Sequence, residues 1–292
     1  MDYLYKIGGA FTGYFDYLMN EMLFRTDPWW KNYFWWLVMI SLFFWLIEIV
    51  FPWRKNQPII RKDFWLDGFY MFFNFFLLSL IGYNAISMVV VDGINSLFDL
   101  AGASNKVAQF VAGIGMGWKL LFAFLLKDFI QWNVHRMLHR VEWLWQFHKV
   151  HHSVKQMGFA AHLRYHWMER FVYNSVQYIP MALLGFGIEE FFAAHMIALS
   201  IGHFNHTNVN LPLGPLKYIL NNPQMHIWHH AKEQPSPFGT NFGISLSIWD
   251  YIFRTNWIPG DGKDVELGFP DEAQFPKDFV GQELYPFKKP KE

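Results

Sequence analysis

Residues 32–51 read NYFWWLVMISLFFWLIEIVF, a twenty-residue segment in which Glu48 is the only charged side chain. Residues 68–91 form a second apolar segment with no charged side chain. A helix of about 20 residues crosses the hydrocarbon of a bilayer, so both segments are long enough to span it. Tryptophans lie near the segment ends, as interfacial anchors do: Trp29, Trp30, Trp35, Trp36, Trp53 and Trp65. We predict two transmembrane helices, with a pair of buried core helices as the alternative.

A third span is predicted over 107–126, where Lys119 would have to face protein, water or a headgroup. The loop between the first two spans carries an excess of basic residues and is therefore placed in the cytoplasm. Those residues are Arg54, Lys55, Arg61 and Lys62. Three crossings then bring the chain after 126 to the cytoplasmic side.

The apolar stretch 171–206 is interrupted by glycines and glutamates near its middle. Each arm is short for a full crossing, so we predict a re-entrant or shallow membrane hairpin. The predicted organisation is an N-terminal region and transmembrane anchor (1–126), a catalytic region (127–256) and a C-terminal surface tail (257–292). The fold class is all-α, an integral membrane helical bundle with a cytoplasmic histidine-rich helical cap.

The composition argues against a soluble globular enzyme. Hydrophobic residues make up 53% and charged residues 16% of the 292 residues, whereas soluble domains carry about 25% charged residues. Lys+Arg equals Asp+Glu at 24 each, so no basic excess points to nucleic acid. The chain contains no cysteine, which excludes disulfides, cysteine-ligated metals and thiol nucleophiles.

All 13 histidines lie at or beyond position 135. Eight of them form three clusters with helical spacing. On a helix, residues i, i+3 and i+4 share a face, so each cluster would direct its imidazoles to a common point. Neutral imidazole is a good ligand for iron, zinc and copper. The spacing H-x-x-H-H occurs twice, whereas chance would give it about 0.03 times. The clusters are His135-Arg-Met-Leu-His139, His148-Lys-Val-His151-His152 and His226-Ile-Trp-His229-His230.

Eight or more histidines exceed the needs of one zinc ion or one haem, because zinc takes three or four protein ligands and haem at most two. The count indicates two metal ions that share about ten ligands. The motif H-E-x-x-H is absent, which disfavours a zinc protease. Two irons held by imidazoles in a membrane favour activation of dioxygen and attack on an unactivated C–H bond of a lipid.

The three clusters resemble the histidine boxes of the fatty acid hydroxylase/sterol desaturase superfamily, whose members are integral membrane di-iron oxygenases. The resemblance covers roughly 115–256. Asp128 stands seven residues before the first box, as an Asp commonly does in the family. Residues 163–169, LRYHWME, are similar to the family's R-F-H-P-x-E stretch, with Trp167 in place of Pro.

The resemblance continues around the last box. Residues 206–208 and 213–216 are most similar to the alkylglycerol monooxygenase branch. Residues 241–243 and 248–255 resemble the family's N-Y-G and W-D-x-x-F-G-T elements, with Arg254 in place of Gly.

The resemblance implies two iron ions ligated by the eight box histidines, with dioxygen as co-substrate. It also implies His166 and His206 as further ligands, with His162 and His203 as their respective alternatives. Four carboxylates are candidates for orienting the imidazole N–H groups: Asp128, Glu142, Glu169 and Asp250. The expected metal ligands are thus His135, His139, His148, His151, His152, His166, His206, His226, His229 and His230.

The expected function is a lipid hydroxylase acting on an acyl, sterol or alkyl chain in a multi-pass membrane protein. A desaturase using the same site and a glycerol-ether monooxygenase with a pterin reductant are the alternatives. A haem electron carrier or a metal transporter fits poorly, because the predicted spans contain no His and few ionisable residues. The expected partners are a membrane lipid and a separate electron donor, with the active site on the cytoplasmic side. The C-terminal lysines lack dilysine retrieval spacing, which favours a bacterial inner membrane over endoplasmic reticulum.

Overall fold

The structure is a computed structural model, and it describes residues 15–74 and 104–288 together with residues 13, 93, 96–100 and 102. Within these residues every regular element is a helix, and β-type pairing is confined to two isolated bridges. The prediction of an all-helical chain is therefore confirmed for the described residues. Most of the predicted second span lies outside them; its first residues end helix α3 (Phe64–Phe73).

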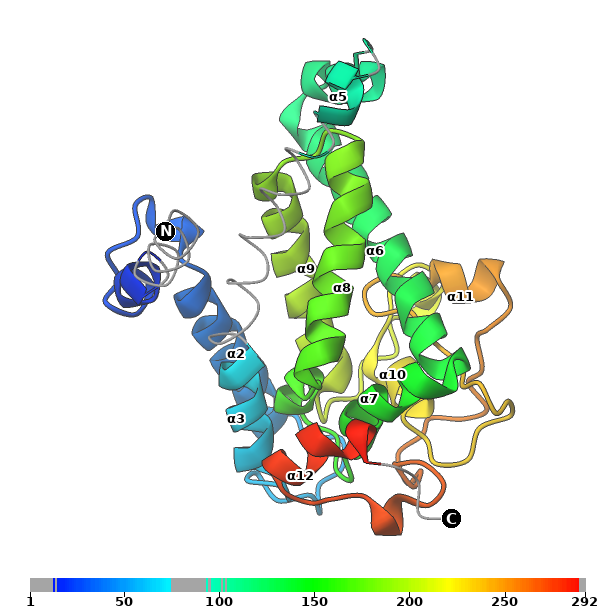
Figure 1. The fold of residues 1–292 in the computed structure, drawn as a ribbon. Coiled ribbons are helices and arrows are strands. Elements are labelled where there is room, and N and C mark those ends of the chain that lie inside the picture. Colours follow the sequence, from blue (N-terminus) through cyan, green and yellow to red (C-terminus); the bar gives the residue numbers. More distant parts are fainter. Residues whose placement is uncertain are drawn as a thin grey trace.

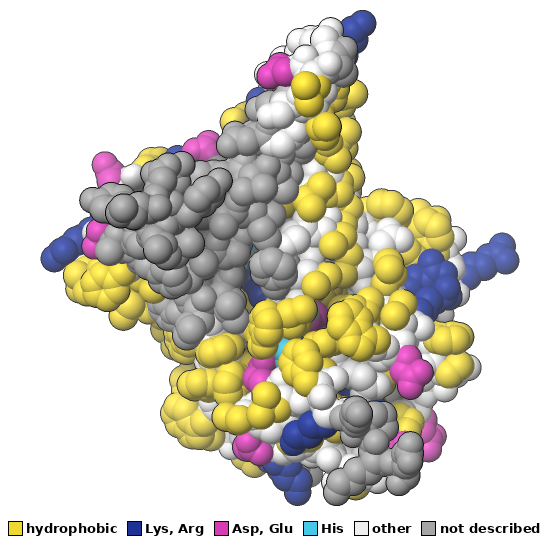
Figure 2. Space-filling model, viewed as in Figure 1, with side chains coloured by type: hydrophobic (Ala, Val, Ile, Leu, Met, Phe, Trp, Pro, Cys, Tyr) yellow, Lys and Arg dark blue, Asp and Glu magenta, His cyan; other side chains and the backbone are white. Residues whose placement is uncertain are grey.

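Helix α2 (Tyr33–Val50) coincides with the first predicted span. The side chain of Asn32 caps it by accepting the Trp35 N–H at 3.0 Å. In the described part of the chain it is the one helix that is long and apolar enough to cross a membrane. Its outer side chains stay uncovered by protein, with Phe43 57% and Leu46 59% exposed. Hydrophobic side chains also gather along the helical arm and around its base on the face in Figure 2.

The continuous span predicted over 107–126 is wrong in its bounds. The structure has a short helix α5 (Lys106–Gly113) and a separate long helix α6 (Met116–Arg140). The two helices are separated because Ile114 and Gly115 are extended, with ψ of 152° and 149°. Helix α6 then runs well past the predicted end and carries the first histidine box in its last turns.

The stretch around the predicted hairpin forms two helices, α8 (Trp167–Leu183) and α9 (Ile188–His206). Their connection turns at Gly185, where φ is +86° and a Cβ atom would lie 2.5 Å from the Ala108 Cα. Only glycine combines this left-handed backbone with so close an approach. Helix α6 packs against both α8 and α9, and the three form the long arm in Figure 1. The relation of the hairpin to a membrane stays a prediction.

Shorter helices gather at the base of the arm (Figure 1). They are α7 (Glu142–His152), α10 (Pro223–His229), α11 (Ile248–Ile252) and α12 (Phe279–Leu284). Single 3₁₀ turns complete the described elements: η1 (Trp29–Lys31), η3 (Phe159–Leu163), η4 (Gly214–Tyr218), η5 (Glu272–Gln274) and η6 (Tyr285–Phe287).

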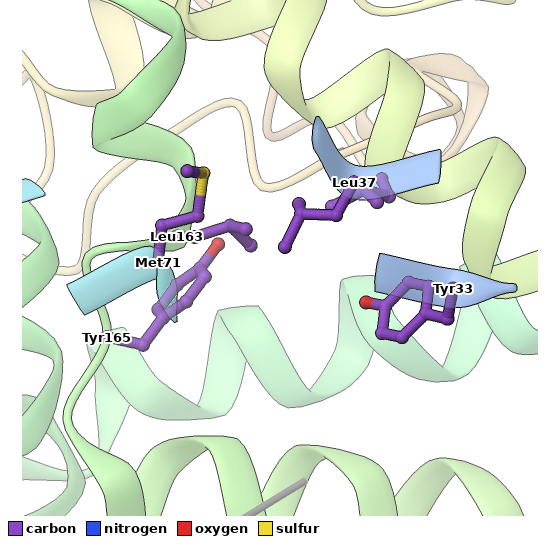
Figure 3. Close-up of a cluster of buried hydrophobic side chains, with 6 residues drawn as sticks. Tyr33, Leu37, Met71, Leu163 and Tyr165 are labelled. Carbon is purple, nitrogen blue, oxygen red and sulfur yellow. The ribbon is translucent and has the colours of Figure 1, made fainter. Parts of the chain in front are cut away.

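A hydrophobic cluster joins the N-terminal helices to this base. Figure 3 shows Tyr33 and Leu37 of α2 facing Met71 of α3, Leu163 and Tyr165. Burial of such side chains stabilises the packing by about 1.5–3 kcal/mol each. At the far end of α2, Oε1 of Glu48 accepts the backbone N–H groups of Phe159 and Asn208, at 2.7 and 2.9 Å. The one charged residue of the predicted span thus ties α2 to the base.

The C-terminal segment predicted as a surface tail is anchored to the base by a few buried side chains. Helix α12 and η6 contact α7, and Phe269 and Phe275 are 3% and 6% exposed. The Tyr70 hydroxyl of α3 donates to Gln282 at 3.1 Å. The abundance of Pro, Gly and charged residues concealed the few aromatic side chains that anchor this segment.

Candidate metal centre

Nine histidines meet in two adjacent groups inside the base. In each group every residue offers one ring nitrogen, and these nitrogens lie within 4.8 Å of one another. The five-histidine group contains His135, His139, His148, His152 and His229. The four-histidine group contains His151, His206, His226 and His230.

The three boxes do not each point to one place, as the sequence had suggested. Successive helical residues are about 100° apart, so i+4 lies about 40° from i, while i+3 lies about 60° to the other side. On α7, His148 and His152 therefore join the five-histidine group, whereas His151 joins the four-histidine group. At the end of α10 the division is reversed, with His226 and His230 in one group and His229 in the other. The H-x-x-H-H spacing thus supplies both groups from each helix.

Hydrogen bonds fix the tautomers of His135 and His148. The Nδ1–H of His135 donates to the Phe242 carbonyl at 2.7 Å, and that of His148 donates to Glu169 Oε1 at 3.0 Å. Both Nε2 atoms consequently carry lone pairs, yet they face each other at 3.1 Å. Two buried lone pairs at this distance repel each other unless a cation lies between them.

His229 and His206 also hold Nδ1 against a backbone carbonyl and turn Nε2 toward another imidazole. His229 donates its Nδ1–H to the Thr240 carbonyl at 2.8 Å and turns Nε2 toward His152 at 3.1 Å. His206 donates to the Gly202 carbonyl at 2.7 Å and turns Nε2 toward His226 at 3.0 Å. Nitrogens bound cis to one metal at about 2.1 Å would lie about 3.0 Å apart. The donor set and its spacing therefore fit two metal ions.

The box histidines are held neutral. Burial lowers the pKa of His135 to about 4. Burial, followed by the charge of neighbouring imidazoles, lowers the pKa of His139, His148, His152 and His230 well below 6.5. Neutral imidazole is the form that binds metal, so these groups need not lose a proton near neutral pH.

Of the four carboxylates expected to orient imidazoles, Glu169 contacts a box histidine directly. Burial raises the pKa of the Glu169 carboxyl well above its usual range, with Arg170 opposing the rise. Asp250 acts one step further away, because it accepts the N–H groups of Phe242 and Gly243 at 2.9 and 2.7 Å. It thereby positions the Phe242 carbonyl, which accepts the Nδ1–H of His135.

Asp128 and Glu142 do not reach a histidine. Asp128 accepts the N–H groups of Ser245 and Leu246 and the indole N–H of Trp249, at 3.2, 3.3 and 2.8 Å. It joins α6 to the segment before α11. Glu142 is exposed in the first turn of α7.

The structure does not bring His166 to either group. Its Nε2–H donates to the Glu283 carbonyl at 2.8 Å, and its Nδ1 accepts the Met168 N–H at 3.1 Å as the N-cap of α8. Both ring nitrogens are therefore used, and we leave His166 out of the ligand set. Trp167 occupies the first helical position, where the family's Pro would also fit.

The alternative ligands His162 and His203 also lie outside both groups. Their Nδ1 atoms face each other at 2.9 Å, and Nε2 of His203 contacts the Ser41 hydroxyl at 3.1 Å. Of the two histidines predicted to compete in α9, His206 is the one that joins a group.

Aromatic rings and backbone carbonyls complete the surroundings, and sequence reasoning missed both. Tyr165 stacks on His151 with ring centroids 4.6 Å apart, and Trp145 lies 4.9 Å from His139. These rings exclude water from the nitrogens. The carbonyls of Gly202, Thr240 and Phe242 carry no side-chain signal, so only the resemblance of residues 241–243 could have pointed to them.

The loop around residue 241 is shaped by left-handed backbone. Gly239 has φ of +78°, and a Cβ atom there would lie 2.9 Å from Nδ1 of His139. Arg254, which replaces the family's Gly, has φ of +56°. The family pattern at this position thus has a direct conformational reason.

Comparisons with known proteins agree with this geometry. Residues 120–255 match the family described as fatty acid hydroxylase. An ornithine lipid hydroxylase from Rhizobium tropici is 30% identical over 187 residues, which cover 61% of this chain and 56% of that protein. Alkylglycerol monooxygenase from Homo sapiens is 36% identical over 140 residues, 47% of this chain and 30% of that protein. A very-long-chain aldehyde decarbonylase from Oryza sativa subsp. japonica is 27% identical over 183 residues, 61% of this chain and 55% of that protein.

The matched region spans little more than half of the hydroxylase and the decarbonylase, and less than a third of the alkylglycerol monooxygenase. No solved structure matches the chain.

Proposed function

We propose that this chain, whose residues 120–255 match the fatty acid hydroxylase family, is a membrane-bound oxygenase that hydroxylates a lipid. Two iron ions would be held by the five-histidine and four-histidine groups defined above. Bound iron would supply the activation of dioxygen, from which one oxygen atom enters a C–H bond of an acyl, sterol or alkyl chain.

The observation that carries the proposal is the contact between Nε2 of His135 and Nε2 of His148 at 3.1 Å, because both Nδ1 atoms are already bound to oxygen. In the four-histidine group, Nε2 of His206 and Nε2 of His226 make a second close contact at 3.0 Å. Each contact is made by neutral, buried imidazoles and fits a cation. Nine nitrogens in two adjacent sets suit two metal ions and exceed what one zinc or one haem uses.

The protein's own residues would prepare the site. The carbonyls of Phe242, Thr240 and Gly202 and the carboxylate of Glu169 hold Nδ1–H groups, so that Nε2 stays free. Such support partners orient ligands and raise their basicity. The rings of Trp145 and Tyr165 keep the nitrogens dry.

We place α2 in a membrane and the base on the cytoplasmic side, with a bacterial inner membrane as the proposed location. The uncovered apolar face of α2 and the basic loop after α2, with Arg54 and Lys55, support this orientation. A membrane lipid is the proposed substrate, and a separate protein is the proposed electron donor.

The deciding experiment compares total lipids from the native host, wild type against His229→Ala, by mass spectrometry. A species one oxygen heavier that is lost in the mutant would support the hydroxylase. A species two hydrogens lighter that is lost would instead establish a desaturase. Metal analysis of the purified chain should give about two irons, and one zinc or a haem would overturn the proposal.

A second candidate is an ether-lipid monooxygenase. The 36% identity to human alkylglycerol monooxygenase favours it, together with the resemblance of residues 206–208 and 213–216 to that branch. Purified protein supplied with an alkylglycerol and a reduced pterin would then consume the ether. Consumption of an acyl lipid but not of the ether would reject this candidate.

A further inference from the structure

A narrow cavity lies between helices α6, α8 and α9, next to the four-histidine group. Its lining includes Tyr165, whose ring stacks on His151, and His162, whose ring centroid lies 5.1 Å from that of His206. One aromatic side chain therefore separates this cavity from candidate metal ligands. The cavity is close enough to hold part of a molecule on which the site acts.

Two basic side chains line the cavity, Lys127 from α6 and Arg170 from α8. Lys127 of α6 is 2% exposed, and its Nζ has Gln131 Oε1 at 3.4 Å as its hydrogen-bond partner. Arg170 of α8 turns Nη2 toward His195 at 3.4 Å and hydrogen-bonds the Tyr33 side chain, while its Nε is buried without a partner. Among the described residues, neither cation lies within 4.0 Å of a carboxylate oxygen.

The two nearest acidic residues in the sequence are committed elsewhere. Asp128 accepts two backbone N–H groups from the segment before α11 and the indole N–H of Trp249 in α11, and Glu169 accepts the Nδ1–H of His148. No acidic side chain is among the described residues that line the cavity. The charge of Asp128 acts on Lys127 and that of Arg170 acts on Glu169, but neither carboxylate lines the cavity. Burial lowers the pKa of Lys127 to about 7, so an anion bound in the cavity would favour its charged form and pair with both basic side chains.

The remaining polar groups in the lining can donate hydrogen bonds to such an anion. The Tyr173 hydroxyl is buried without a partner in the described structure, and Gln131 and Gln177 lie on the same walls. Leu163, Ala198 and Leu199 supply the apolar part of the lining. Planar Arg and flexible Lys side chains together suit carboxylate or phosphate oxygens.

We propose that this cavity binds the anionic oxygen group of the lipid substrate, a carboxylate or a phosphate, with Lys127 and Arg170 as its counter-charges. The proposal rests on the proposed function, because it assumes a lipid substrate. It adds that the substrate is an anionic lipid whose charged end lies beside the four-histidine group. Oxidation would then occur at a carbon close to that end.

The test measures binding rather than turnover. The full chain in a neutral detergent is titrated with hexadecyl phosphate, with hexadecanoate and with uncharged hexadecan-1-ol. Wild type should bind the two anionic probes at least about tenfold more tightly than the alcohol. Lys127→Met and Arg170→Gln should each remove most of that preference, because one charged hydrogen bond contributes about tenfold in affinity.

Two further variants serve as controls. Lys119→Met lies two turns before Lys127 on α6 and outside the cavity, so it should keep the full preference. Arg170→Lys retains the charge and should keep part of the preference for the anionic probes. Should the neutral variants fail to fold, competition in wild type still tests the proposal, because hexadecyl phosphate should displace hexadecanoate whereas hexadecan-1-ol should not.

Equal binding of all three probes by wild type would overturn the inference. So would an anion preference that survives in folded Lys127→Met and Arg170→Gln, or displacement of the probes by millimolar inorganic phosphate alone. Because binding requires no oxygen or reductant, a chain that binds the anionic probes but never oxidises a lipid would overturn the proposed function and leave the binding site standing.

Discussion

Glu169 accepts the Nδ1–H of His148 at 3.0 Å, and both side chains are fully enclosed, with 2% and 0% exposure. The contact joins the first turn of α8 to the second histidine box on α7. It leaves Nε2 of His148 unprotonated and directed at Nε2 of His135. A carboxylate held against Nδ1 in this way would strengthen the binding of a metal ion at Nε2.

Replacing Glu169 with Ala should weaken metal binding about 10–100-fold, because His148 loses the acceptor that fixes its tautomer and ring orientation. Glu169→Gln keeps an acceptor oxygen and should lose less. Iron affinity measured by competition with a chelator tests this order. Glu142→Gln, on the exposed start of α7, is the matched control and should bind iron as wild type does. An unchanged affinity in Glu169→Ala would mean that the contact has no effect on the site.

His166→Asn should keep the full metal content, although His166 was among the ligands expected from the sequence. Asn is a good N-cap and can accept the Met168 N–H in place of Nδ1. His206→Asn should lose metal from the four-histidine group, because it removes a nitrogen that faces His226 at 3.0 Å. Metal per chain, determined by mass spectrometry of the purified variants, separates the two. Loss of metal in His166→Asn, with wild-type thermal stability, would return this residue to the ligand set.

Much of the site was predictable because metal ligation restricts residue type and spacing. The nine histidines that meet include all eight of the boxes and His206. The spacing alone could not divide H-x-x-H-H between two groups, because that division depends on where α6, α9 and α10 lie around α7. His166 was misplaced for a related reason: an imidazole that caps a helix and one that binds a metal carry the same letter.

The errors in the fold have physical causes as well. The third span was drawn through Ile114 and Gly115 because both are apolar, although their extended backbone ends α5. The composition predicts a surface tail over 257–292, and much of this segment is exposed, yet a few aromatic side chains such as Phe275 are buried and anchor it. Composition reports average polarity, whereas packing depends on the positions of individual large side chains.

The metal-free protein should lose stability as the pH falls below about 6.5. Burial depresses the pKa of the eight box histidines, that of His135 to about 4. Between about pH 4 and pH 6.5 these histidines bind protons in the unfolded chain but not in the folded chain, so the free energy of unfolding rises with pH. Four buried acids oppose the trend, because burial raises their pKa values: Asp128 to about 6, Glu283 to about 7, and Glu169 and Asp250 above their usual range. The eight histidines outnumber them.

The melting temperature of the metal-free chain in neutral detergent, followed from pH 7.5 down to pH 5, measures this dependence. Iron should shift the decline to lower pH, because bound metal holds the imidazoles in the unprotonated form. A melting temperature that stays level between pH 7.5 and pH 5 would show that the histidines are solvated or otherwise paired.

Arg254→Gly should leave the protein as stable as wild type or more stable, by up to about 1 kcal/mol. Arg254 has φ of +56°, a conformation that costs a side chain with a Cβ atom about 1–2 kcal/mol. Glycine removes that strain, although its greater freedom in the unfolded chain cancels part of the gain. Arg254 follows α11. The loop there is held by the Thr255 hydroxyl, which donates to Oδ1 of Asp250 at 2.6 Å. Because Asp250 also fixes the Phe242 backbone, relief at 254 should leave the metal content unchanged.

Lys119→Gly, inside α6, is the contrasting substitution and should destabilise by about 1 kcal/mol, because that position is helical. Thermal unfolding of the two variants beside wild type gives the comparison directly. If Arg254→Gly were as damaging as Lys119→Gly, the guanidinium itself would be making a stabilising contact that outweighs the strained backbone, and the departure from the family pattern would be an adaptation of this chain.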